Sequence, residues 1–246
     1  MRYAILTDIH ANRQGFTAVL DDLAQRQVDR IVLLGDIVGY GPDPEWCCDR
    51  VMALVEQGAL ALRGNHDAAI TEPDPAMNIT ARRVIDWTRP RLSEAQRTFL
   101  TGLPMSARIG ETLFVHASAN DPGDWLYVTS AERAMPSFRV CDARVILCGH
   151  VHVPLLVSCD RLGAVRQQPI PMGAPMPLIR SRRWLAVVGS TGQPRDGKPL
   201  AGYAIHDTDR DELTFRRVPY DTAATVARIG AEGLPPSLAM RIISGA

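Results

Sequence analysis

The sequence has no excess of either charge and almost no lysine. Lysine plus arginine and aspartate plus glutamate number 27 each among 246 residues, and Lys198 is the only lysine. A protein that binds a polyphosphate backbone usually carries a strong basic excess. The balanced charge therefore gives no electrostatic reason to expect a nucleic-acid partner. We attribute the abundance of arginine to codon bias rather than to a role in recognition.

Cysteine is scarce, and its pattern fits neither a disulfide framework nor a zinc knuckle. The five cysteines are odd in number and form no C-x-x-C pair, which is typical of reduced thiols in a reducing compartment. No apolar run approaches the roughly 20 residues that cross a bilayer, and no secretory leader pattern is found. We therefore expect a cytoplasmic protein without a membrane partner. Its 46% hydrophobic and 22% charged residues indicate a substantial core.

Apolar runs alternate with amphipathic segments in the first quarter of the chain. The runs at 2–7, 31–34 and 59–62 are predicted to be buried strands, separated by helices around 16–23 and 45–56. This order indicates a parallel sheet with right-handed crossovers.

A polar residue directly follows each of these three runs. Asp8, Asp36 and Asn65 stand where the predicted strands end. Ligands of open α/β sheets lie beyond the carboxyl ends of the strands. We therefore expect these three side chains to meet at one rim of the sheet.

The remainder of the chain is predicted to complete one domain over residues 1–246. Residues 68–104 contain several prolines and two amphipathic segments, which indicate a helical insertion beside the rim. The later elements are expected in this order: a hairpin of 105–109 and 112–116 turning at Gly110, a helix at 130–139, a strand at 144–148, runs at 153–158, 164–170, 184–188, 202–206 and 212–217, and two short helices within 220–243. The five runs between 153 and 218 suggest a second, mainly antiparallel sheet.

Five of the six histidines stand after an apolar run, beside Asp, Asn or Gly. They are His10, His66, His116, His150 and His152. His206 belongs to none of these motifs and is interpreted as structural. His150 and His152 project to the same side of an extended segment, a spacing that suits a metal ion.

Each motif also has an ordinary structural interpretation when it is taken alone. Asp8 could cap the following helix, Asp36 could be a surface residue of a turn, and His116 could be a core histidine. Asn65, His66 and Asp67 are harder to explain in this way, because a buried strand rarely needs three consecutive polar residues at its exit. It is the occurrence of all the motifs in one order, each at a strand exit, that favours a functional site.

Taken together, D-x-H at Asp8, G-D-x-x-G at Asp36, G-N-H-D at Asn65, a lone His116 and G-H-x-H at His150 resemble the calcineurin-like metallophosphoesterase superfamily. The segment 189–197 is similar to one in small prokaryotic members. The resemblance implies a four-layer α/β/β/α sandwich of two mixed sheets flanked by helices, in keeping with the α/β pattern of the runs.

The resemblance also implies a site for two divalent cations. Asp8, His10 and His152 would complete one ion, Asn65, His116 and His150 the other, and Asp36 would bridge them. Carboxylate, amide and imidazole ligands without thiolate suit Mn, Fe or Zn. A hydroxide bridging the ions would attack the phosphorus of the substrate in line.

Four further residues are candidates for catalysis or substrate binding. His66 is predicted to protonate the leaving oxygen or stabilise its charge, and Asp67 to orient His66. Arg63 and Arg195 are candidates for binding the substrate phosphate. The alternatives are that His66 is a spacer and that both arginines are structural.

The predicted function is hydrolysis of a small phosphomonoester or phosphodiester. The protein Ser/Thr phosphatases of the superfamily carry Asp and Arg where this chain has Gly39 and Tyr40, and Glu where it has Asp67. These departures weaken the phosphoprotein phosphatase alternative. A nuclease and an inactive scaffold are the remaining alternatives. We expect the insertion at 68–104 and the loop after His116 to form the walls of the pocket, through Asn120, Asp121, Asp124, Trp125 and Tyr127.

Overall fold

The first apolar run forms the strand β1 (Arg2–Leu6), which is buried on both of its faces. In the computed structural model, which describes residues 1–246, Tyr3 and Ile5 point into an apolar layer on one side of the sheet. Ala4 and Leu6 point into a second layer on the other side. Successive side chains of a strand point in opposite directions, so burial of both faces explains why the run is continuously apolar.

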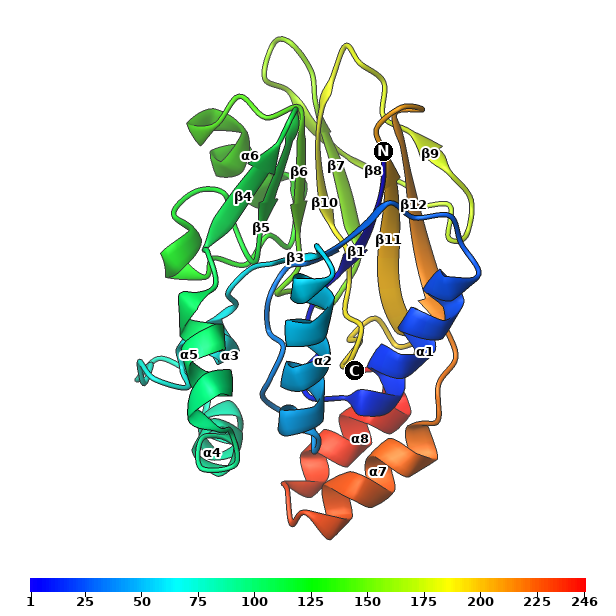
Figure 1. The fold of residues 1–246 in the computed structure, drawn as a ribbon. Coiled ribbons are helices and arrows are strands. Elements are labelled where there is room, and N and C mark those ends of the chain that lie inside the picture. Colours follow the sequence, from blue (N-terminus) through cyan, green and yellow to red (C-terminus); the bar gives the residue numbers. More distant parts are fainter.

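Strand β1 lies inside a six-stranded sheet of order β3-β2-β1-β11-β12-β9 (Figure 1). Strands β1, β2 and β3 are parallel, as predicted, and β11 and β12 add to β1 in antiparallel fashion. The elements of this sheet and its crossovers are α1 (Arg13–Ala24), β2 (Arg30–Leu33), α2 (Pro44–Glu56), β3 (Leu60–Ala61), β9 (Met176–Pro177), β11 (Ala201–Asp207) and β12 (Glu212–Val218).

The second six-stranded sheet has the order β4-β5-β6-β10-β7-β8. Its strands are β4 (Ser106–Ile109), β5 (Thr112–Val115), β6 (Val145–Cys148), β7 (Leu155–Cys159), β8 (Val165–Gln168) and β10 (Arg183–Val187). The predicted hairpin is confirmed: β4 pairs with β5 and the chain reverses at Gly110, whose φ is +57°.

One prediction about the sheets is wrong. The runs between 153 and 218 do not form a sheet of their own. Strands β7, β8 and β10 join β4–β6, whereas β9, β11 and β12 extend the sheet that begins with β1. Both sheets are mixed, because each contains parallel and antiparallel pairs. In the second sheet the late strand β10 is parallel to β6, and the early strand β4 is antiparallel to β5. The strand order could not be read from the runs, since β10 and β11 are both continuously buried.

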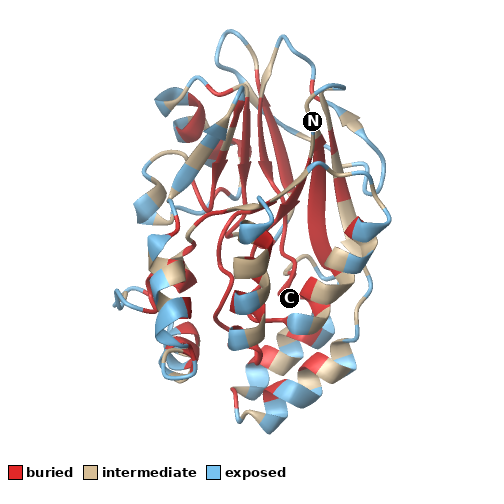
Figure 2. Cartoon of the chain, viewed as in Figure 1, coloured by how far each residue is buried: buried red, intermediate tan, exposed pale blue.

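Helices cover the outer faces of the two sheets, so that the molecule has four layers (Figure 1). Helices α1 and α2 contact the first sheet, α6 (Ala131–Val140) contacts the second, and the pair α7 (Thr222–Ala231) and α8 (Pro236–Ser244) packs beside α1. Figure 2 shows that buried residues concentrate in the central strands of the sheets. None of the helices combines the length and the apolar character needed to cross a membrane.

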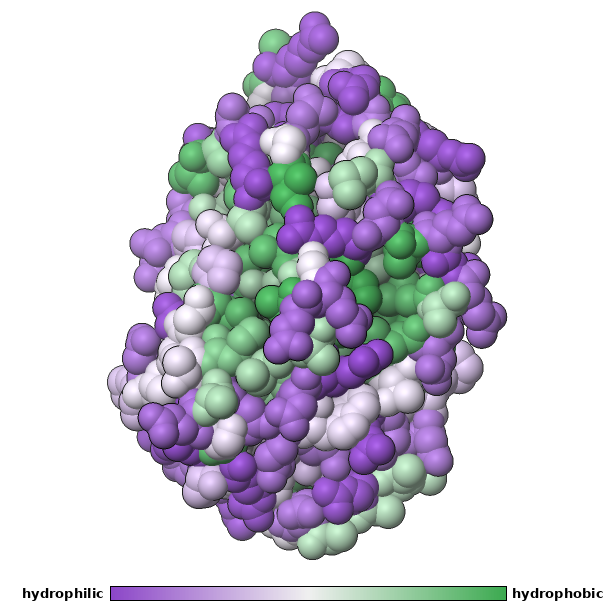
Figure 3. All heavy atoms as spheres, in the orientation of Figure 1, coloured by the Kyte–Doolittle hydropathy of each residue, from purple (hydrophilic) through white to green (hydrophobic).

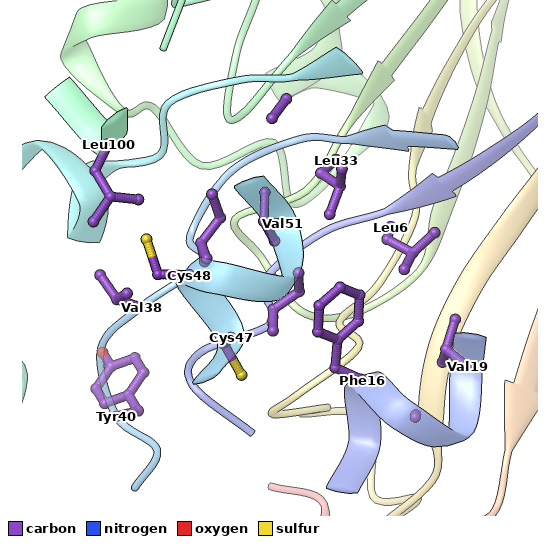
Figure 4. Packing of buried hydrophobic residues seen from close by; sticks show 14 of the residues in the cluster. Leu6, Phe16, Val19, Leu33, Val38, Tyr40, Cys47, Cys48, Val51 and Leu100 are labelled. Atoms are coloured by element: carbon purple, nitrogen blue, oxygen red, sulfur yellow. The ribbon is translucent and has the colours of Figure 1, made fainter. Parts of the chain in front are cut away.

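Three apolar clusters correspond to the three spaces between the four layers. One lies between the sheets, one beneath α6, and the largest beneath α1 and α2. Figure 4 shows Phe16 and Val19 of α1 and Val51 of α2 gathered around Leu6 and Leu33 of the sheet. Hydrophilic residues cover most of the face in Figure 3, with apolar residues gathered near its centre.

The insertion at 68–104 is helical, as predicted. It contains α4 (Ile79–Thr88) and α5 (Glu94–Gly102) and follows the single turn α3 (Asn65–Ala68). Asn78 accepts a hydrogen bond from the Ala81 amide and so caps α4, and Ser93 forms a capping box with Gln96 at the start of α5. Such caps satisfy amides that have no partner within the helix.

Candidate metal centre

The structure brings together all seven residues predicted to bind metal. Each stands just beyond a strand: Asp8 and His10 after β1, Asp36 after β2, Asn65 after β3, His116 after β5, and His150 and His152 after β6. Five of them have backbone angles in the left-handed region, with φ values of 53° (Asp8), 48° (His10), 53° (Asp36), 66° (His150) and 65° (His152). Non-glycine residues rarely adopt this region, and residues that do so cluster at functional sites.

The first group of ligand atoms surrounds His10. Its Nε2 lies 3.0 Å from His152 Nε2 and 3.6 Å from Asp36 Oδ2. Asp8 Oδ1 lies 3.2 Å from His152 Nε2. All four side chains are buried.

The second group surrounds His116. Its Nε2 lies 3.2 Å from His150 Nδ1, 3.3 Å from Asn65 Oδ1 and 3.5 Å from Asp36 Oδ2. Asp36 Oδ2 is therefore the one ligand atom that faces both groups, at the position where a bridging carboxylate would lie.

Hydrogen bonds made by the Nδ1 atoms of three histidines determine which ring nitrogen faces the centre. His10 Nδ1 donates to Val38 O at 3.2 Å, His116 Nδ1 to Leu34 O at 2.9 Å and His152 Nδ1 to Gln193 O at 2.6 Å. A carbonyl oxygen can only accept, and a neutral imidazole has a single N–H. In the neutral rings, each Nε2 therefore presents a lone pair to the centre.

These lone pairs and one unpaired carboxylate oxygen fit a metal ion. The two Nε2 lone pairs of His10 and His152 would repel each other at 3.0 Å without a cation between them. The Oδ2 atom of Asp8 accepts hydrogen bonds from Thr7 Oγ1 at 2.8 Å and His150 N at 2.9 Å. Its Oδ1 is buried without any donor. A buried anionic oxygen without a donor is costly unless a cation compensates it.

The pKa values of the ionisable groups in the site also favour a bound cation. Burial would raise the pKa of Asp8, but the His152 imidazole outweighs it and holds that pKa well below its usual range. Burial lowers the pKa of His10, and lowers that of His150 to about 3, so both rings are neutral at pH 7. Burial also disfavours a charged His116, but the Asp36 carboxylate raises its pKa to about 9. In the metal-free site, the proton on His116 compensates the charge of Asp36, as a bound cation would.

His66 lies beside this centre. Its ring centroid is 4.5 Å from that of Tyr40 and 4.8 Å from that of His10. The side chain is 4% exposed, lines the cavity described below, and has no hydrogen-bond partner at Nδ1. Gly39 passes so close, at φ +86°, that a Cβ atom there would overlap the His66 ring. Burial lowers the pKa of His66 to about 4.

Asp67 does not contact the His66 ring through a hydrogen bond, in contrast to its predicted orienting role. Its Oδ1 accepts from the amides of Ile37 at 2.9 Å and Val38 at 3.3 Å, and its Oδ2 from the Gly64 amide at 3.0 Å. Burial and the nearby Asp36 raise the pKa of Asp67 to about 7, while these amides act to lower it. Asp67 thus joins the loop that carries Asp36 to the turn that carries Asn65.

The two candidate arginines lie in different places. Arg63 does not reach the cavity: its guanidinium donates to Glu72 Oε1 at 3.3 Å and to Thr101 O at 3.4 Å. The structure therefore gives no support to the predicted role of Arg63 in binding phosphate, because its side chain is held by residues of the insertion and α5 outside the cavity. Arg195 lines the cavity, donates to Gln193 Oε1 at 2.9 Å, and lies 5.6 Å from the Tyr40 ring.

A cavity of about 290 Å³ opens over the centre. Its walls come from the regions that the sequence indicated. The insertion supplies Asp74, Ala76, Met77 and Asn78, and the loop after His116 supplies Asp124, Trp125 and Tyr127. Asn120 and Asp121 of that loop do not line it.

Tyr40 and Ser190 contribute to the site but were not predicted as site residues. Tyr40 lines the cavity, and the only signal for it was its departure from the protein phosphatase pattern. Ser190 donates from Oγ to Asp8 O at 2.8 Å and accepts from the Gln193 amide at 2.8 Å. The segment 189–197 thus holds Asp8 and His152 in place through hydrogen bonds from Ser190 and to Gln193.

Residues 1–211 match the calcineurin-like phosphoesterase superfamily domain. The chain belongs to this superfamily, and it is a metallophosphoesterase, a hydrolase that acts on ester bonds. The resemblance inferred from the motifs is confirmed.

Two solved structures agree with the fold. A metallophosphoesterase from Sphaerobacter thermophilus is 37% identical, with a TM-score of 0.89 and coverage of 100% of this chain and 99% of its own. A hypothetical protein from Pyrococcus horikoshii, 21% identical, superposes with a TM-score of 0.80 over 100% of this chain and 98% of its own. The predicted sandwich of two mixed sheets flanked by helices is confirmed.

A relative of similar length is known from sequence. An uncharacterised protein of Methanocaldococcus jannaschii is 30% identical over 248 residues, which cover 98% of this chain and 97% of that one. The similarity therefore includes the C-terminal helices α7 and α8, which lie beyond the residues that match the superfamily domain.

Proposed function

We propose that the centre binds two divalent cations, Mn, Fe or Zn, and hydrolyses a phosphomonoester or phosphodiester of a small molecule. One observation carries the proposal: Asp36 Oδ2 faces both groups of ligand atoms, 3.6 Å from His10 Nε2 and 3.5 Å from His116 Nε2. Each group contains imidazole nitrogens and at least one further oxygen ligand, which suits these ions.

Two such ions would neutralise the charge of a phosphate and lower the pKa of water, so that a hydroxide nucleophile is available near pH 7. The residues of the chain supply the geometry. Asp36 is held by the His66 amide, which donates to its Oδ1 at 2.8 Å and leaves Oδ2 free to face the centre. Three backbone carbonyls fix the histidine rings, as partners in the outer shell of metal sites commonly do.

Two residues beyond the ligands would act on the substrate. His66 lines the cavity next to Asp36 and Asn65, where it would protonate the leaving oxygen or donate a hydrogen bond to it. Arg195 is the one arginine that lines the cavity, and its guanidinium would bind a phosphate oxygen.

The shape of the site favours a small ester over a protein or a nucleic acid. The cavity of about 290 Å³ is bounded by the insertion on one side and by Trp125 and Tyr127 on another. This volume lies at the lower end of those that hold small ligands. A phosphopeptide or a DNA strand would need a longer groove.

Reconstitution with metal tests the proposal. The purified protein, treated with chelator and then loaded with Mn, is assayed on p-nitrophenyl phosphate, its bis ester, a phosphopeptide and single-stranded DNA. We expect turnover of at least one p-nitrophenyl ester, two bound ions per chain by elemental analysis, and loss of most turnover in Asp36→Asn and His66→Gln. His66→Gln should keep both ions, because His66 is no ligand in the proposal, whereas Asp36→Asn should lose affinity for them.

The matched control is Asp21→Asn, an exposed position on α1 that does not line the cavity. It should retain both ions and full turnover. Inertness of the fully loaded protein toward all four substrates would refute catalysis and favour the scaffold alternative. Binding of a single ion would refute the dinuclear centre.

A further inference from the structure

The charges that line the cavity are opposite to those expected of a site for polyanions. Arg195 is the only lysine or arginine among the lining residues, whereas Asp74 and Asp124 both line the cavity away from the ligand groups. Neither of these two carboxylates has a salt-bridge partner, although several arginines on the surface are paired with acids. They are therefore uncompensated negative charges at the entrance to a phosphate site.

The same cavity presents aromatic rings beside these carboxylates. Tyr127 is 55% exposed and its ring centroid lies 4.1 Å from that of His150, and the Trp125 ring lies 5.8 Å from that of His116. Both aromatic residues belong to the loop that carries Asp124. Aromatic faces next to carboxylates bind ammonium groups, because the ring face is negative and a cation is easily desolvated there.

Two buried histidines of the candidate metal centre also line this cavity. His66 and His150 are 4% and 5% exposed, both line the cavity, and each has one ring nitrogen that is buried without a partner. Asp74 and Asp124 therefore line the same cavity as the candidate metal centre.

We infer that Asp74, Asp124, Trp125 and Tyr127 select a substrate with one phosphate group and a positively charged leaving group, of the amino-alcohol class, and reject substrates with additional negative charge. The inference rests on the proposed function of the same site. Bound cations and Arg195 would compensate a single phosphate. A second phosphate or a carboxylate on the leaving group would meet the two aspartates, whereas an ammonium group would be attracted by them and by the rings.

Binding of three short-chain phosphonates that differ in the charge of the terminal group tests this selection without requiring turnover. The probes are 2-aminoethylphosphonate, propylphosphonate and 2-carboxyethylphosphonate, titrated calorimetrically into the Mn-loaded protein. One unit of charge on a ligand near charged groups at the surface of a protein changes affinity about three- to tenfold. We expect Kd to rise in the order amino, propyl, carboxy, by about that factor at each step, and the differences to shrink as salt is added.

Variants identify the residues responsible. Asp74→Asn and Asp124→Asn remove one negative charge each. The Asn side chain at position 74 keeps an oxygen that can accept a hydrogen bond from the Ala76 amide, which donates to Asp74 at 2.8 Å. Together the two substitutions should bring the three Kd values to within about threefold of one another. Tyr127→Leu should weaken binding of the amino probe, and Tyr127→Phe should restore it. Asp21→Asn, which removes an exposed charge elsewhere, should change none of the ratios.

The outcomes separate the inference from the function on which it rests. Equal Kd values in the parent protein, tighter binding of the carboxy probe, or ratios that survive both aspartate substitutions would overturn the inference, even if p-nitrophenyl phosphate is hydrolysed. The expected order without hydrolysis of any ester would instead refute the proposed function and leave the charge selection standing.

Discussion

His206 provides a test of how burial governs the stability of this fold. It lies on β11, paired with Tyr3 of β1, and is 1% exposed. Both ring nitrogens are buried without a hydrogen-bond partner. Burial, reinforced by Arg144, lowers the pKa of His206 to about 4 from the ordinary value of 6.5.

This difference makes stability depend on pH in a defined window. The unfolded chain takes up a proton at His206 below about pH 6.5, whereas the folded protein resists it until about pH 4. The folded state is therefore favoured fully above the unfolded pKa, and it loses this advantage as the pH falls through the window. The two pKa values imply a loss of about 3 kcal/mol well below pH 4, of which about 2 kcal/mol is lost between pH 8 and pH 5.

The substitution His206→Leu removes this titration while nearly conserving volume. Urea unfolding of metal-free protein at pH 8 and pH 5 gives the free energy of unfolding for both chains. Other groups, including the histidines of the metal centre, titrate equally in the two. The loss of stability between pH 8 and pH 5 should be about 2 kcal/mol smaller in the variant, whatever its absolute stability. Equal losses in the two chains would refute the reasoning.

Three further predictions concern the metal centre. Gly149→Ala places a Cβ where it would overlap the Thr7 hydroxyl and the Asp8 carboxylate. Metal affinity, measured by calorimetry, should therefore fall about 10- to 100-fold. Unchanged affinity would show that the loop adjusts freely. Binding of metal at pH 7 should release a proton from His116, because Asp36 raises its pKa to about 9; calorimetry in buffers of different ionisation enthalpy measures this release, and a count of zero contradicts the assignment. Arg195→Lys should raise KM about tenfold, because an ammonium group does not replace the planar guanidinium that would bind the phosphate. Arg63→Lys, outside the cavity, should leave KM unchanged, and equal effects would remove Arg195 from the substrate site.

The sequence predicted best what depends on local periodicity. Continuous apolar runs identified β1 and β2, and the polar residue after each run identified Asp8 and Asp36, because the end of a buried strand fixes where the next side chain lies. The pairing of later strands was beyond reach, since it depends on which sheet edge is free rather than on the run itself. The direction of Arg63 and the hydrogen bonds of Asp67 were equally inaccessible, as both depend on contacts between loops that are distant in the chain.

The candidate metal ligands come from both sheets. Asp8, Asp36 and Asn65 follow strands of the first sheet, and His116 and the pair His150 and His152 follow strands of the second. A cation bound by Asp8 and His152, or by Asn65 and His116, is therefore a reversible crosslink between the two halves of the sandwich. Chelation should loosen one half against the other, so that protease sensitivity between the sheets rises as metal is withdrawn and falls as metal is supplied.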